Sequence, residues 1–216
     1  MRLVPLLFAS FLVTAAQAQD TTPPLDAATP APHAPAQPAP VAGPKVLIST
    51  SMGDITLQLD QQHAPLTVAN FVRYAREHHF DGTLIYRVVP GILIQGGSWD
   101  GPAHARPVHK PIPLEANNGL KNVRGAIAMA HGDPNSATAE YFIDLIDAPS
   151  LDQLPTDTAN STGFAVFGNV VDGLDVLDRI GHVAVGDNGP MKGQAPVDPI
   201  KVIEVQVLPN AAQAAQ

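Results

Sequence analysis

The chain of 216 residues contains no cysteine. It therefore forms no disulfide, and it offers no thiolate as a nucleophile or as a metal ligand. This absence is compatible with an oxidising compartment but does not require one.

Basic residues are scarce as well. Lys and Arg together number 12, against 20 Asp and Glu, and the formal net charge is -8. An acidic chain without a basic cluster is a poor match for a phosphate backbone. We therefore expect no nucleic-acid partner.

Several catalytic motifs are also missing. The nearest match to the G-x-S-x-G motif of serine hydrolases is GGSWDG, where Asp100 replaces the second glycine. Neither a P-loop nor a G-x-G-x-x-G motif occurs. The eight histidines are scattered. On a helix the adjacent His78 and His79 would point about 100 degrees apart, and we expect both to be surface residues. We expect no metal and no cofactor, and we expect the acids Asp144 and Asp147 to face solvent.

A long apolar run occurs only at the start of the chain. Residues 1–18 contain one cation, Arg2, then an apolar stretch, and end in Ala16-Gln17-Ala18. This layout predicts a signal peptide cleaved after Ala18. The alternative, a membrane anchor, would need an apolar run of roughly 20 residues. We therefore expect an exported protein, most simply periplasmic, with no membrane insertion after cleavage.

The next segment, residues 19–44, holds eight of the 22 prolines, interleaved with alanine. Such a composition favours an extended coil, and we interpret the segment as a disordered linker. A proline-rich ligand for another domain and a cell-wall spacer are the alternatives. Residues 45–209 are enough for one domain with a sizeable core, and residues 210–216 form a disordered tail.

The domain contains many short apolar runs and two helical patterns. KVLIST and DITLQL flank Ser51-Met52-Gly53, which predicts a hairpin. Residues 64–80 predict a helix with Pro65 in its first turn, and residues 172–181 predict a second helix that ends at Gly181. Further strands are expected in TLIYRVV, GILIQGG, GAIAMA, EYFIDLI, FAVFGNVV and IKVIEVQVL. Short strands with two helices favour an antiparallel barrel or sandwich over a wound parallel sheet.

One cation stands out inside a strand-like run. Arg87 lies in IYRVVPGILIQGG, with the amide Gln95 eight residues later. Rotation about an Xaa-Pro bond needs neither a nucleophile nor a metal, since its barrier of about 20 kcal/mol comes from amide resonance. A guanidinium that hydrogen-bonds the prolyl nitrogen lowers the double-bond character, while an apolar surface holds the ring. If Arg87 has no such role, its simplest explanation is an ion pair with an acid such as Glu140.

The same residues resemble a known family. FDGTLIYRVVPGILIQGG, RGAIAMA, NSATAEYFI, SLD and FAVFGNVVDGLDVLDRI follow in the order of the cyclophilin signatures, and the resemblance covers residues 45 to 208. The pattern is most similar to that of bacterial periplasmic cyclophilins. The resemblance implies a mainly β fold, a closed eight-stranded antiparallel β-barrel capped by two α-helices. It also implies peptidyl-prolyl cis-trans isomerase activity that assists the folding of exported proteins.

Position by position, the resemblance makes Arg87 and Gln95 the catalytic residues. The substrate-binding positions that it implies are Ile92, Leu93, Met129, Ala130, His131, Phe142, Leu151 and Phe164. The implied partners are proline-containing polypeptides, bound by a monomer.

Three positions depart from the family pattern. Ile85 and Ile92 replace aromatic residues, and Glu140 replaces a glutamine. An aliphatic side chain lacks the flat aromatic face that packs on a proline ring. The two aliphatic replacements, Ile85 and Ile92, leave a second hypothesis open, a chaperone or scaffold that binds proline segments with little turnover.

Overall fold

A computed structural model describes residues 43–154 and 162–209. The predicted signal peptide, the predicted tail and all but the last two residues of the predicted linker lie outside these ranges. Among the described residues, no helix has the length and apolar character needed to cross a bilayer.

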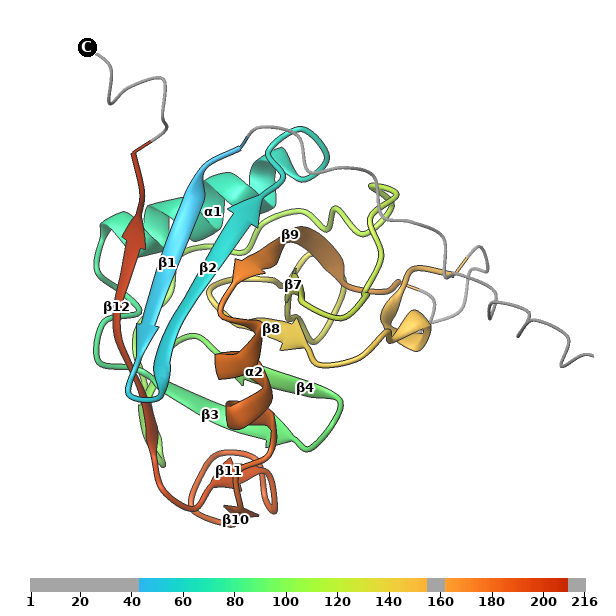
Figure 1. The fold of residues 1–216 in the computed structure, drawn as a ribbon. Coiled ribbons are helices and arrows are strands. Elements are labelled where there is room, and N and C mark those ends of the chain that lie inside the picture. Colours follow the sequence, from blue (N-terminus) through green and yellow to red (C-terminus); the bar gives the residue numbers. More distant parts are fainter. Residues whose placement is uncertain (1–42, 155–161, 210–216) are drawn as a thin grey trace, which may run out of the picture. The chain divides into compact units, whose positions relative to one another are not determined.

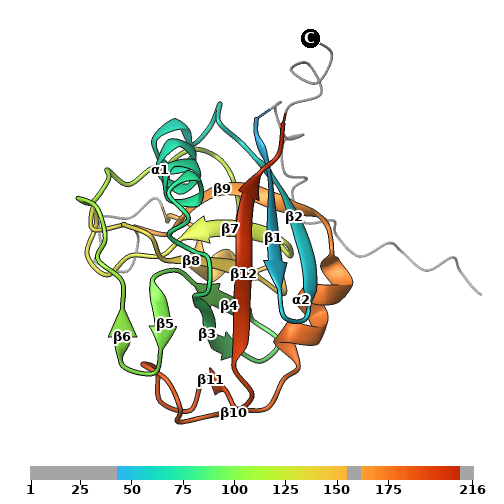
Figure 2. The ribbon, with the colours of Figure 1, turned by 90° about the vertical axis from the view of Figure 1, so that its left-hand side faces the viewer.

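Eight strands form a closed antiparallel barrel in the order β1-β12-β3-β4-β8-β7-β9-β2 (Figures 1 and 2). The predicted fold class is therefore confirmed, and closure decides between barrel and sandwich. The barrel strands are β1 Lys45–Thr50, β2 Gly53–Leu59, β3 Leu84–Val89, β4 Leu93–Gly96, β7 Ala126–Met129, β8 Tyr141–Asp144, β9 Ala165–Asp172 and β12 Ile200–Val207.

The first hairpin forms where the sequence predicts it. β1 and β2 pair from Lys45↔Gln58 to Thr50↔Gly53. Gly53 has φ +127°, a conformation that a residue with a Cβ rarely adopts. Two short two-stranded sheets lie outside the barrel, formed by β5 (Trp99–Gly101) with β6 (His104–Ala105) and by β10 (Val185–Gly186) with β11 (Ala195–Pro196).

The helices α1 (Pro65–Arg76) and α2 (Leu174–Gly181) cover opposite ends of the barrel (Figures 1 and 2). Pro65 occupies the first turn of α1 as predicted. The free N–H groups of Leu66 and Thr67 donate to the carboxylate of Glu115, which caps the helix from a distant loop.

Because α1 ends at Arg76, His78 and His79 follow the helix. His79 is half-buried and its ring packs on Tyr74, which corrects the expectation that both histidines are surface residues on a helix.

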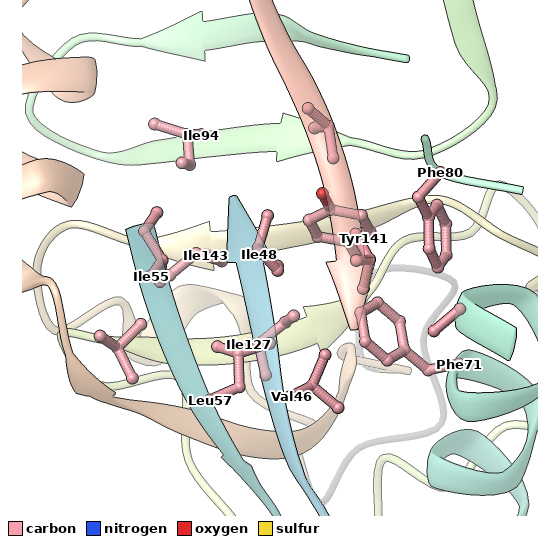
Figure 3. Packing of buried hydrophobic residues seen from close by; sticks show 14 of the residues in the cluster. Val46, Ile48, Ile55, Leu57, Phe71, Phe80, Ile94, Ile127, Tyr141 and Ile143 are labelled. Atoms are coloured by element: carbon pink, nitrogen blue, oxygen red, sulfur yellow. The ribbon is translucent and has the colours of Figure 1, made fainter. Parts of the chain in front are cut away.

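Alternate residues of the strands fill the barrel interior. Figure 3 shows the isoleucines of β1, β2, β4, β7 and β8 pointing toward one another, with Tyr141 among them. Phe71 from α1 closes one end, with its ring centroid 5.1 Å from that of Phe80 and 5.5 Å from that of Tyr141. Since successive strand residues point to opposite faces, the neighbours of these core residues lie on the outside of the barrel.

Candidate active site

A row of cross-strand partners crosses the outer face of the barrel. The register pairs Arg87 with Gln95, Gln95 with Phe142, Phe142 with Ala128, and Ala128 with Val166. Directly opposed residues of neighbouring strands project on one face. The row therefore crosses five strands, from Arg87 on β3 and the amide of Gln95 on β4 to apolar side chains on β8, β7 and β9.

The guanidinium of Arg87 is held by two amide oxygens. Its Nη1 donates to Gln95 Oε1 at 2.9 Å, and its Nε donates to Gln194 Oε1 at 2.5 Å. The backbone carbonyl of Gln194 also accepts from Val88 N at 2.7 Å, which fastens the β10–β11 loop to β3. Among the described residues Nη2 donates no hydrogen bond. One side of the guanidinium is thus fixed, and the other has donors free for a substrate.

Beside Arg87 lies an apolar patch that we call the outer cluster. Its buried members are Leu93, Leu120, Ala126, Ala128, Phe142 and Val166, and its partly buried members are Val89, Val123, Ala130, Leu151 and Phe164. The rings of Phe142 and Phe164 meet edge to face with centroids 5.2 Å apart. Phe164 N donates to the carbonyl of Leu151 at 3.0 Å, so Phe164 is tied to the short 3-10 helix η1 (Pro149–Leu151).

The outer cluster brings together five of the eight predicted substrate-binding residues, namely Leu93, Ala130, Phe142, Leu151 and Phe164. His131 joins them at the edge, where its ring centroid lies 4.8 Å from that of Phe164 and its Nε2 lies 2.9 Å from the carbonyl oxygen of Gly163. Ile92 lies in the β3–β4 turn and is 42% exposed.

Met129 is placed differently from the prediction. Its side chain belongs to the barrel core and is 1% exposed, so it cannot line the outer face. The reason is strand alternation, since Ala128 faces outward and Met129 therefore faces inward. Ile85 is also a core residue, with 2% exposure. Its replacement of an aromatic residue therefore removes nothing from the outer face, and only Ile92 remains as a departure there.

Glu140 does not pair with Arg87. Its carboxylate accepts from Ser98 N at 2.8 Å and lies so close to Gly97 that a Cβ there would be 2.5 Å from it. Burial raises the pKa of Glu140, while the Ser98 and Tyr86 groups partly offset the rise. The alternative explanation for Arg87, an ion pair with this acid, is therefore wrong.

Asp144 is buried, contrary to the prediction that it faces solvent. It is 0% exposed, and neither carboxylate oxygen has a hydrogen-bond partner among the described residues. Burial above all, with the nearby charges of Asp152 and Asp147, raises its pKa to about 8. Asp144 therefore carries a proton at neutral pH. Two-residue alternation places Asp144 on the same outer face of β8 as Phe142, where it is nevertheless covered and buried.

Sequence reasoning missed Gln194 and Tyr86. Gln194 lies in a loop 107 residues from Arg87, and nothing local marks it. Tyr86 lies at an irregularity between Ile85 and Arg87 where β3 shifts its register with β4. Its hydroxyl accepts from Gln95 Nε2 at 2.5 Å. A tyrosine next to the candidate arginine was visible in the sequence, but its direction was not.

Comparison with known proteins decides the family. The model described as cyclophilin type peptidyl-prolyl cis-trans isomerase/CLD matches residues 45–207. The chain belongs to the cyclophilin family. This cyclophilin is a peptidyl-prolyl cis-trans isomerase, an enzyme that speeds rotation about Xaa-Pro bonds.

Bacterial relatives are similar over nearly the whole domain. Peptidyl-prolyl cis-trans isomerase A of Dickeya dadantii is 39% identical over 76% of this cyclophilin and 84% of the relative. Peptidyl-prolyl cis-trans isomerase B of Escherichia coli is 40% identical over 75% of this chain and 98% of the relative.

A solved structure shows the same fold. The cyclophilin type isomerase of Cryptosporidium parvum, crystallised in the presence of the dipeptide Ala-Pro, has a TM-score of 0.62 at 22% identity. The match covers 77% of this cyclophilin and 99% of that chain.

Proposed function

We propose that this cyclophilin is exported and isomerises Xaa-Pro bonds in polypeptides that fold outside the cytoplasm, acting as a monomer. The layout of residues 1–18 supports export, since a cation, an apolar stretch and a small-x-small end form a signal peptide. Proline-containing polypeptides are the substrate class, in keeping with the Ala-Pro dipeptide present with the Cryptosporidium relative.

The geometry of Arg87 carries the catalytic part of the proposal. Gln95 and Gln194 hold its Nη1 and Nε, so the guanidinium is oriented before a substrate arrives. A donor aimed at the prolyl nitrogen stabilises the twisted amide, whose nitrogen lone pair has left conjugation, more than the planar one. Interactions that are stronger in the transition state than in the ground state accelerate the reaction.

The outer cluster supplies the surface for the proline ring. Phe142 lies in the same row as Arg87 and Gln95, and Leu151 and Phe164 are its partly exposed neighbours. A ring packed there is held while the acyl side of the bond turns past Arg87. Ala130 and His131, next to Phe164, are placed to contact the residue before proline.

Substitution of Arg87 tests the catalytic role. In a protease-coupled assay of a short Xaa-Pro peptide, Arg87→Ala should lower kcat/KM by about a hundredfold, equivalent to about 2.7 kcal/mol of transition-state stabilisation. Arg76→Ala, which removes an exposed arginine at the end of α1, is the matched control and should leave the rate unchanged. Equal rates for the wild type and Arg87→Ala would refute the proposed role.

The same assay addresses the second hypothesis. If the protein is a scaffold with little turnover, the wild type should not accelerate isomerisation. The Arg87→Ala variant should then still bind a proline peptide with wild-type affinity. This alternative was suggested by the aliphatic residues Ile85 and Ile92. Because Ile85 lies in the core, only Ile92 still supports it.

Export is tested separately. The full chain, expressed in a Gram-negative host, should appear in the periplasmic fraction with Gln19 as its first residue by mass spectrometry. Deletion of residues 2–18 should retain it in the cytoplasm. An uncleaved chain in the cytoplasmic fraction would contradict the proposed location without affecting the enzyme.

A further inference from the structure

Behind Arg87, a chain of polar groups runs into the protein. Gln95 uses both ends of its amide, since Oε1 accepts from Arg87 Nη1 at 2.9 Å and Nε2 donates to Tyr86 Oη at 2.5 Å. Gln95 is 9% exposed, so water does not readily replace either partner. Whatever orients the Tyr86 hydroxyl therefore also orients Gln95.

The carboxylate of Glu140 lies next to that hydroxyl. Burial first, and then the nearby carboxylate of Glu140, raise the pKa of Tyr86. The phenol therefore keeps its proton. Glu140 Oε1 accepts from Ser98 N at 2.8 Å, whereas Oε2 is buried without a hydrogen-bond partner among the described residues. The phenol accepts from Gln95, so its own hydrogen is the donor available to this carboxylate.

The direction of these hydrogen bonds depends on the charge of Glu140. A carboxylate can only accept, so it directs the phenol hydrogen toward itself and leaves a phenol lone pair for Gln95 Nε2. Gln95 must then present Oε1 to Arg87, as observed. A protonated Glu140 can instead donate to the phenol. The phenol hydrogen would turn to Gln95, which would have to present Nε2 to Arg87, so that two donors would face each other.

We propose that Tyr86 and Glu140 are positioning residues for this isomerase, and that the ionised Glu140 carboxylate, acting through Tyr86 and Gln95, holds the Arg87 guanidinium in place. The proposal rests on the catalytic role proposed for Arg87. It predicts that catalysis weakens as the pH falls and Glu140 gains a proton.

The groups around Glu140 come from three segments. Tyr86 and Arg87 project from β3, Tyr141 from β8, and Ser98 follows β4. The Ser98 hydroxyl lies 3.1 Å from His79 Nε2, and burial, followed by the charge of Arg106, lowers the pKa of His79. This shift favours the neutral form of His79. Since burial raises the pKa of Glu140, its protonation begins at a higher pH than for an exposed glutamate.

The experiment is a pH profile of kcat and KM for the full-length wild type, Glu140→Gln, Tyr86→Phe, Tyr141→Phe and Arg87→Ala. NMR exchange spectroscopy of an Xaa-Pro peptide needs no protease and covers about pH 4 to about pH 8. The wild-type kcat should fall at the acid end with KM changing less than kcat. Glu140→Gln should retain activity and lose this acid limb, because an amide does not titrate in this range.

Tyr86→Phe should lower kcat about tenfold at the alkaline end, the effect of losing one orienting hydrogen bond, and should also lack the acid limb. Tyr141→Phe is the matched control. It removes a second buried phenol hydroxyl, one with no hydrogen-bond partner among the described residues, and should leave the profile unchanged.

The outcomes separate the two proposals. If Arg87→Ala remains active, the catalytic role of Arg87 fails. If Arg87→Ala is inactive but the kcat of Glu140→Gln still falls at acid pH as in the wild type, only the proposal that Glu140 acts through Tyr86 and Gln95 fails. A measurement on the wild type alone guards against variants that do not fold. The ¹⁵N resonance of Gln95 Nε2, which donates to Tyr86, should shift with pH in step with the fall in kcat at acid pH. A constant resonance would overturn the proposal that Glu140 acts through Tyr86 and Gln95.

Discussion

Gln194 Oε1 accepts a hydrogen bond of 2.5 Å from Arg87 Nε, joining two residues 107 positions apart in the sequence. Gln95 holds the same guanidinium through Nη1. The side chain of arginine has several rotatable bonds, and two fixed acceptors restrict its rotation before a substrate binds. The β10–β11 loop therefore takes part in the site even though it lies far from the signature motif.

Replacing Gln194 by alanine should lower kcat/KM about fivefold to tenfold, because Arg87 loses one of its two acceptors. The backbone hydrogen bond from Val88 to residue 194 is retained, so the loop should stay in place. The protease-coupled assay measures the effect. Gln206→Ala, an exposed glutamine on β12, is the control, and an identical rate for Gln194→Ala would show that Gln95 alone positions the arginine.

Asp144→Asn should change how stability depends on pH. The folded-state pKa of Asp144 is raised from 3.8 to about 8, so the unfolded chain releases this proton first and the wild type loses stability as the pH rises between these values. The variant lacks this loss. Its advantage in the free energy of unfolding should grow by up to about 1.4 kcal/mol per pH unit across that window. Urea unfolding at several pH values measures it, and a difference that does not vary with pH would contradict the burial of an uncompensated carboxyl group.

Gly173→Ala should destabilise the barrel. Gly173 precedes α2 with φ +87°, and a Cβ there would lie 2.2 Å from the carbonyl oxygen of Asp54 in β2. Left-handed strain and this overlap together should lower the free energy of unfolding by about 3 kcal/mol. Gly119→Ala is a matched control, since it has φ +83° but no atom within 4 Å. It should lose only about 1 kcal/mol, from strain alone. If both variants lose the same free energy of unfolding in urea, the close approach of Gly173 to β2 does not contribute to the destabilisation.

Ile92→Phe should raise kcat/KM a few-fold. Ile92 is 42% exposed in the turn that leads into Leu93, and an aromatic ring there adds apolar area for a proline to contact. The control is Ile203→Phe on β12, where an isoleucine is 59% exposed away from the outer cluster. If both variants match the wild type in the isomerase assay, the aliphatic residue at position 92 does not limit substrate binding.

The elements were largely predictable because their causes are local. Alternation in residues 45–59 predicts the first hairpin, and the spacing of Val68, Phe71, Val72 and Ala75 predicts the buried face of α1, as the structure shows. The signature around Arg87 likewise placed Gln95 on the next strand. Burial was harder to predict. Asp144 carries a charge in the sequence, yet strand β8 places it on the covered face beside Phe142.

By itself, therefore, the sequence determined the element order, the family and the residues around Arg87, since turn chemistry, strand period and motif spacing are properties of neighbouring residues. Only the tertiary structure decided that Gln194 reaches Arg87, that Glu140 accepts from Ser98 instead of pairing with the arginine, and that Met129 and Ile85 face the core. The physical reason is that these contacts depend on barrel closure and on the register between strands, which bring together side chains that no local pattern relates.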